Sequence, residues 1–198
     1  DLVRSRGLGD VYKRQQLHIG HGALYNASVV FAADGLPIGE PQRQLYPIYD
    51  ERGFIAPGDE NIVSVVDTPA GRLGILIGSD SWYPDNYRKL NEQGAQLVAV
   101  PAFVTGRDTW DRPWRGFKSV STPPEISLKP EELSEGEAWR RLTLISQQPI
   151  SQASAGMSVF LRGQFWDLGT AGHSFLSNDG HVTAGNDARG ARLLNIWL

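Results

Sequence analysis

The chain contains no cysteine, so no cysteine nucleophile can operate in it. A serine, Ser79, lies in the segment Gly78-Ser79-Asp80-Ser81, which follows an apolar run. Strand-to-helix turns of this kind often display nucleophiles. A serine hydroxyl needs an adjacent base, however, and no histidine lies near Ser79 in the sequence. The alternative interpretation is that Gly78 and Ser79 are small because the turn is tight.

The turn lies inside a predicted strand–helix–strand unit over residues 72–101. Residues 72–77 are apolar nearly throughout, which is typical of a strand buried on both faces. A helix is expected to begin near Pro84 and to end at Gly94, because proline suits the first helical position and glycine suits the helix end. A second apolar strand is expected at 96–101. Such a unit predicts an α/β fold in which helices cover a sheet.

Further elements are expected on both sides of this unit. Ser134 and Glu137 form a possible capping box before a helix over 135–147. Asp34-Gly35 and Asn178-Asp179-Gly180 suit hairpin turns. Other strands are predicted from their β-branched and apolar composition at 27–32, 36–39, 62–67, 158–161, 173–176 and 191–198.

A long loop with aromatic and basic side chains is predicted over residues 103–130. Together with Trp166, these side chains could form a pocket rim for a small carboxylate or amide: Arg107, Trp110, Arg112, Trp114 and Arg115. Ordinary packing of the aromatic side chains, with solvated arginines, explains the same composition equally well. The residues predicted to bind a ligand are Trp82, Phe103, Trp110 and Arg112.

Composition limits the function classes. A chain of 198 residues suits one domain, since domains usually have roughly 100–200 residues. The net charge of -3 argues against a nucleic-acid partner, and no apolar run has the roughly 18 residues that a membrane helix needs. His173 and His181 have no accompanying carboxylate pattern, so no metal site is predicted. No cofactor is predicted either, and a cytoplasmic location is expected.

Three segments together resemble the carbon–nitrogen hydrolase (nitrilase) superfamily. They are YNASVVFAADGLPIG at 25–39, RQLYPIYDERGFIAPGD at 43–59 and TPAGRLGILIGSDSWYPDNYRKLNEQGAQLVAVPA at 68–102. Weaker similarity continues over 156–180. The resemblance implies an α-β-β-α sandwich and a homo-oligomer. It also implies a mechanism with a cysteine nucleophile, a glutamate base, a lysine that stabilises the oxyanion, and a second glutamate.

The family's site residues can be carried over position by position. The resemblance places Gly78 where the cysteine belongs, Gln44 where the lysine belongs, and Glu51 at the second glutamate. The first glutamate would lie upstream of residue 16. Glutamine donates hydrogen bonds but carries no charge, so Gln44 would stabilise an oxyanion less well than lysine does.

Residues 1–15 (DLVRSRGLGDVYKRQ) lack helical or strand periodicity and resemble translated sequencing-adapter sequence. We therefore expect one domain over 16–198 that is truncated at its N-terminus.

The leading hypothesis for function is a nitrilase-superfamily protein that does not hydrolyse C–N bonds by the usual cysteine mechanism. It would bind a small amide, nitrile or carboxylate. The first alternative is an active amidase with a rearranged site that uses Ser79 and Glu51. The second alternative is a non-catalytic module that dimerises.

Overall fold

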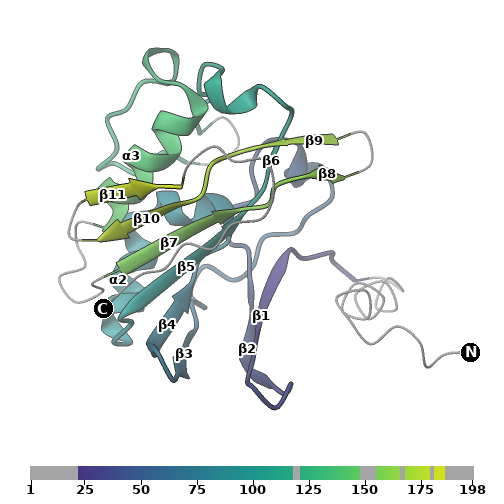
Figure 1. Ribbon diagram of the computed structural model, residues 1–198, viewed down its shortest axis with the longest axis vertical. Coiled ribbons are helices and arrows are strands. Elements are labelled where there is room, and N and C mark those ends of the chain that lie inside the picture. Colours follow the sequence, from purple (N-terminus) through teal and green to yellow (C-terminus); the bar gives the residue numbers. More distant parts are fainter. Residues whose placement is uncertain (1–21, 118–120, 148–154, 166–167, 179–180, 186–198) are drawn as a thin grey trace, which may run out of the picture.

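The computed structural model describes residues 22–117, 121–147, 155–165, 168–178 and 181–185. Its centre is a mixed six-stranded sheet in the order β11-β10-β7-β5-β4-β3 (Figure 1). The neighbours β4, β5 and β7 pair in parallel, and the outer pairs are antiparallel. The strands are β3 (Val65–Thr68), β4 (Gly71–Ile75), β5 (Leu97–Ala102), β7 (Ala155–Phe160), β10 (Phe175–Asn178) and β11 (His181–Ala184).

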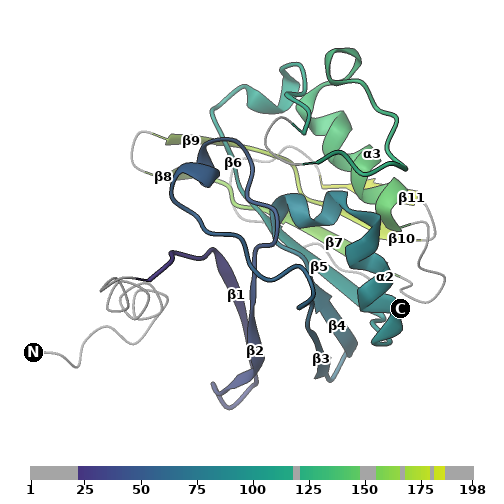
Figure 2. The same ribbon diagram turned by 180° about the vertical axis from the view of Figure 1, so that it is seen from behind.

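Two helices, α2 (Pro84–Glu92) and α3 (Glu135–Gln147), cover the same face of this sheet (Figure 2). Helix α2 connects β4 to the parallel strand β5, as a crossover must. It packs so closely that a Cβ atom at Gly74 of β4 would lie 2.6 Å from Leu90 Cδ2. Glycine at this position therefore allows α2 to approach the sheet. The mixed α/β fold predicted from the sequence is confirmed.

Smaller elements lie around the main sheet. The hairpin of β1 (Ala27–Phe31) and β2 (Pro37–Arg43) forms a separate two-stranded sheet that projects away from the six-stranded one (Figure 1). A short sheet joins β6 (Val104–Thr105), β9 (Leu168–Ala171) and β8 (Gln164–Phe165). The 3-10 turns are η1 (Tyr49–Gly53), η2 (Gly78–Trp82), η3 (Thr109–Asp111) and η4 (Pro130–Glu132).

The core has two parts with different chemistry. Between α2 and the sheet lies an aliphatic cluster that includes Leu76, Leu90, Val98 and Val100. The second cluster joins η2, α3, β7 and the 110–117 segment, and it is aromatic, with Trp82, Trp114, Phe117, Trp139 and Phe160 among its members. The η2 turn therefore lies beside an interior rich in rings.

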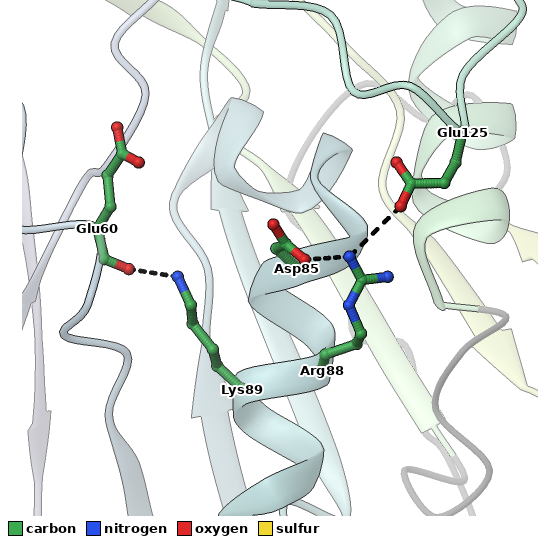
Figure 3. A network of polar contacts seen from close by, with 5 residues as sticks. All are labelled: Glu60, Asp85, Arg88, Lys89 and Glu125. Carbon is green, nitrogen blue, oxygen red and sulfur yellow. Dashed lines mark hydrogen bonds and ion pairs between the residues drawn. The ribbon is translucent and has the colours of Figure 1, made fainter.

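Polar contacts of helix α2 fasten the loops on either side of it (Figure 3). Lys89 Nζ donates to the carbonyl oxygen of Glu60 at 2.6 Å. The Arg88 guanidinium pairs with Asp85 on its own helix and with Glu125 Oε1, at 3.3 Å, on the loop before α3. These exposed pairs add little stability individually. They tie the 60 and 125 regions to the helix that follows η2.

Several element boundaries differ from those predicted. The strand predicted over 62–67 begins only at Val65, because Gln42 Oε1 accepts from Ser64 N at 2.9 Å and Gln42 Nε2 donates to Ile62 O at 3.3 Å. These bonds replace strand pairing at 62–64. The strand predicted over 72–77 ends at Ile75, since the Ile77 N–H donates to the Asp80 side chain at 3.2 Å. The strand predicted over 173–176 begins at Phe175.

Other local predictions hold. The capping box is present, with Ser134 N donating to Glu137 Oε2 at 2.9 Å and Glu137 N donating to Ser134 Oγ at 3.3 Å. The second hairpin is confirmed by the pairing of Asn178 with His181. The predicted strand over 191–198 and Trp166 lie outside the described residues. Among the described helices, none is long and apolar enough to cross a membrane.

Candidate functional site

Gly78 opens the buried η2 turn directly after the chain leaves β4. Its φ of +55° lies in the left-handed region, which L-residues with a side chain adopt only at a cost. A Cβ atom at Gly78 would nevertheless meet no clash, since its nearest neighbours would be Gln44 Nε2 at 3.7 Å and Trp139 Cη2 at 4.0 Å. The position thus combines a left-handed backbone, which glycine adopts without strain, with room for a small group between Gln44 and Trp139.

Gln44 follows the end of β2 and is 2% exposed. Its Oε1 accepts from Asn26 Nδ2 at 3.0 Å, and its Nε2 donates to Glu51 Oε2 at 3.1 Å. Both ends of the amide are therefore held, which fixes the Nε2 atom that faces Gly78. The structure brings together three of the positions that the resemblance assigned: Gln44, Glu51 and Gly78.

Glu51 lies in η1, and its Oε2 also accepts from the Ile48 N–H at 3.0 Å. Burial raises the pKa of Glu51, while the hydrogen bonds from Ile48 and Gln44 oppose that shift. The turn is held in an unusual conformation, because Tyr49 has a φ of 53°. Glu51 is thus a positioned acceptor for the Gln44 amide.

Asp80 is a site residue that sequence reasoning missed. Its fully buried carboxyl accepts from the backbone N–H groups of Leu45 at 2.9 Å, Tyr46 at 2.8 Å and Ile77 at 3.2 Å. These bonds hold the segment that carries Gln44 against the η2 turn. Burial raises the pKa of Asp80 to about 7 in spite of the three N–H donors. The only sequence signal was an acid two residues after Gly78 in a turn expected to be buried.

Ser79, the alternative nucleophile, is 1% exposed. Its hydroxyl donates to the carbonyl oxygen of Tyr46 at 2.5 Å. Ser79 therefore fastens the same segment that Asp80 fastens. The serine hydroxyl already has a structural hydrogen bond, and its oxygen is closed off from solvent.

The four predicted ligand-binding residues have different surroundings. Trp82 is fully buried within η2. Trp110 is buried in the same core, where it stacks on His173 with a centroid distance of 5.4 Å. Phe103 is 40% exposed just after β5, and the exposed Arg112 lies 3.9 Å from Asp108. Of the four, only Trp82 belongs to the turn that contains Gly78.

Helix α3 contributes residues that sequence reasoning did not select. Trp139 reaches Gly78 with its six-membered ring and packs against Trp82 with a centroid distance of 4.8 Å. Glu135, at the start of α3, is 2% exposed, and burial raises its pKa. The Arg115 backbone, the Trp139 indole and the Tyr49 hydroxyl oppose that shift. Within the described residues, no group of three or more His, Cys, Asp or Glu side chains could hold a metal ion.

Comparison with known proteins decides the family. A sequence model described as carbon–nitrogen hydrolase matches residues 9–117, more than half of the chain. The chain belongs to the carbon–nitrogen hydrolase family. The predicted membership is confirmed, and the absence of cysteine from this chain is consistent with the predicted substitution of the family's cysteine position.

Relatives of this homologue include amidases. It is 25% identical over 135 residues to an N-carbamoylputrescine amidase of Solanum tuberosum. This match covers 62% of the chain and 45% of the relative. It is 35% identical over 72 residues to a deaminated glutathione amidase of Yersinia enterocolitica. This match covers 35% of the chain and 24% of the relative. The chain thus spans less than half the length of these curated relatives.

Solved structures support the fold. A carbon–nitrogen hydrolase from Helicobacter pylori G27 matches with a TM-score of 0.62 and 21% identity, over 85% of this chain and 55% of that chain. A mutant amidase of the nitrilase superfamily from Nesterenkonia AN1 matches with a TM-score of 0.58 and 15% identity, over 83% of this chain and 52% of that chain. The predicted α-β-β-α sandwich class is therefore confirmed as a nitrilase-like fold.

Proposed function

We propose that this carbon–nitrogen hydrolase homologue binds a small amide, nitrile or carboxylate at Gly78 and does not hydrolyse it by the family's cysteine mechanism. The observation that carries the proposal is the geometry at Gly78. The left-handed backbone and the clash-free direction between Gln44 and Trp139 are suited to a nucleophilic side chain, yet the residue has none. A ligand group can occupy the space that a thiol would fill.

Gln44 gives this site a binding chemistry that differs from catalysis. Its Nε2 points toward Gly78 and can donate to a ligand carbonyl oxygen, but it supplies no positive charge to a developing oxyanion. Oxyanion stabilisation is usually the largest single contribution to such catalysis. A neutral donor at this position therefore favours binding of an amide or acid without its hydrolysis.

The test measures binding and hydrolysis separately. Melting temperatures are recorded with a panel of small amides, nitriles and carboxylates, and ammonia release is measured with the amides and nitriles. We expect at least one ligand to raise the melting temperature without releasing ammonia. Ammonia release by the unmodified protein would contradict the proposal, and so would a flat melting profile across the panel.

Two variants locate the site. The double variant Gly78→Cys, Gln44→Lys restores the family's residues, and we expect its new thiol to be alkylated faster than a cysteine placed at exposed Asp111. Arg112→Ala tests the predicted contribution of the exposed Arg112 to ligand binding. Trp110 is buried and packed, so its replacement would also disturb the core.

The serine alternative is less well supported. The Ser79 hydroxyl donates a hydrogen bond to Tyr46 O, and the acid nearest to it in the chain, Asp80, accepts from backbone N–H groups. Ammonia release that Ser79→Ala abolishes would favour this alternative. The homo-oligomer, the dimerisation module and the cytoplasmic location stay predictions. Light scattering of the purified protein tests the first two.

A further inference from the structure

The Gln44 segment (residues 44–46) follows β2 and pairs with no strand among the described residues. Its backbone N–H groups at Leu45 and Tyr46 donate instead to the side chain of Asp80, which lies 35 and 34 positions later in the chain. Asp80 is fully buried within the η2 turn. The place of the Gln44 segment is therefore decided by one side chain of the turn that contains Gly78.

The two carboxyl oxygens of Asp80 hold different parts of the site. Oδ1 accepts from the N–H groups of Leu45 at 2.9 Å and Tyr46 at 2.8 Å. Oδ2 accepts from the N–H of Ile77, the residue directly before the η2 turn, at 3.2 Å, and it shares the Leu45 N–H at 3.1 Å. The carboxyl is thus a bridge between the Gln44 segment and the start of the η2 turn.

The surroundings of this bridge suit a carboxylate and not a carboxylic acid. Within the described residues, each hydrogen bond to the Asp80 carboxyl comes from a backbone N–H group. An ionised carboxylate only accepts, whereas a protonated carboxyl carries an O–H donor on one oxygen. That hydrogen would face N–H groups, so at least one of their bonds would lengthen, and the others would lose the strengthening that charge gives. Protonation of Asp80 therefore loosens the bridge.

The groups around Asp80 set the pH at which its charge changes. Burial raises the pKa of Asp80 to about 7, the three N–H donors oppose this shift, and the charge of Glu51 on η1 adds to it. Burial also raises the pKa of Glu51. Tyr46 and Tyr83 interact electrostatically with Asp80, and burial raises the pKa of both, so they stay neutral. The bridge thus changes charge near neutral pH.

We propose that Asp80 is the positioning residue of the Gly78 site: its ionised carboxyl fixes the spacing of Gln44 and Gly78, and its protonation loosens that spacing and weakens ligand binding. This inference rests on the proposed binding function and adds its regulation by pH. Gln44 Nε2 lies 3.7 Å from the place of a Cβ atom at Gly78, so a ligand group bound there depends on the spacing.

Affinity and stability should change in opposite directions with pH. Because binding favours the ionised carboxyl, affinity increases as the pH rises through about 7. The contribution of Asp80 to folding has the other sign, since a pKa raised in the folded state gives stability that is lost as the pH rises through that value. A residue that acted only through stability would make the affinity fall together with the stability.

The binding experiment uses butyramide and butyronitrile, two probes that stay neutral between about pH 6 and about pH 8.5. Calorimetry measures their dissociation constants across this range. We expect the constants to fall roughly threefold to tenfold with rising pH, because the N–H bonds gain charge assistance. Asp80→Asn has similar size but cannot ionise, and it should lose most of this dependence. The exposed control Asp111→Asn should keep it in full.

Backbone amide chemical shifts test the bridge without a ligand. The amide signals of Leu45, Tyr46 and Ile77 should titrate together with a midpoint near pH 7. Glu51→Gln should move this midpoint to lower pH, since it removes the charge that adds to the rise. The titration in the unmodified protein decides the assignment even if Asp80→Asn does not fold.

The outcomes separate the two proposals. If the three amide signals do not titrate together, or if a probe binds equally well throughout the pH range, the assignment of Asp80 is overturned while the binding function stands. Equal pH dependence of binding in Asp80→Asn and in the unmodified protein would overturn it too. If the amides titrate but neither probe binds at any pH, binding of neutral ligands fails, and this inference fails with it.

Discussion

The two sides of the Gly78 turn differ in how their polar groups are satisfied. On the side of β2 and η1, the carboxyl of Asp80 accepts three backbone N–H groups, and Gln44 is bonded at both ends of its amide. On the side of α3, the buried Glu135 carboxyl lies close enough to the Trp139 indole and the Tyr49 hydroxyl for both to oppose the burial-driven rise in its pKa. The first side is a completed framework that positions Gln44. The second side packs one buried acid against a cluster of aromatic rings.

The framework side should be the more sensitive to mutation. Asp80→Ala leaves three buried N–H groups without an acceptor, at about 1–3 kcal/mol each. We expect the free energy of unfolding to fall by at least about 3 kcal/mol. Urea denaturation measures the loss, with the exposed Asp111→Asn as control. A loss below about 1 kcal/mol would remove the distinction between the two sides.

The pH dependence of stability tests the same carboxyl. Burial raises the pKa of Asp80 to about 7, so the folded state holds this proton more tightly than the unfolded state does. Its contribution is therefore fully present below about pH 4 and declines as the pH rises to about 7. The decline could reach roughly 4 kcal/mol, and above pH 7 the contribution is flat. Unfolding curves from pH 4 to 8 should show a downward slope that Asp80→Asn reduces, and the remaining slope comes from Glu51 and Glu135, whose pKa values burial also raises.

Gly78 lies between the two sides, and its replacement should have an intermediate effect. Gly78→Ala places a Cβ on a residue with a φ of +55°, which costs about 1–2 kcal/mol, although the Cβ meets no close atom. Gly53→Ala is the control, because Gly53 has no positive φ and its Cβ direction is open. Equal midpoints in urea for both variants would show that a Cβ at Gly78 costs nothing in the left-handed conformation.

The α3 side should tolerate the loss of charge. Glu135→Gln replaces a buried carboxyl whose pKa is raised by burial with a neutral amide of similar size. We expect the free energy of unfolding at neutral pH to change by less than about 1 kcal/mol, in contrast to Asp80→Ala. Thermal unfolding of the two variants side by side measures this difference. A loss at Glu135 as large as that at Asp80 would make Glu135 part of the framework.

Sequence patterns predicted the local elements well where periodicity and end signals agreed. The strand–helix–strand unit, the capping box of α3 and the second hairpin are all confirmed. The predictions failed where a side chain competes with strand pairing, as Gln42 does at residues 62–64. No local pattern reveals such competition, because its donor and acceptor come from segments that are distant in the chain.

The sequence by itself determined the family, the α/β class and the absence of a cysteine nucleophile, since each depends on residue identity or on short periodic patterns. Resemblance also selected Gln44, Glu51 and Gly78, which the fold brings together. Only the tertiary structure placed Asp80 against residues 45 and 46, and Trp139 against Gly78. It also gave Ser79 a structural hydrogen bond. These contacts join residues more than 30 positions apart, and they form only when sheet, turn and helix pack together.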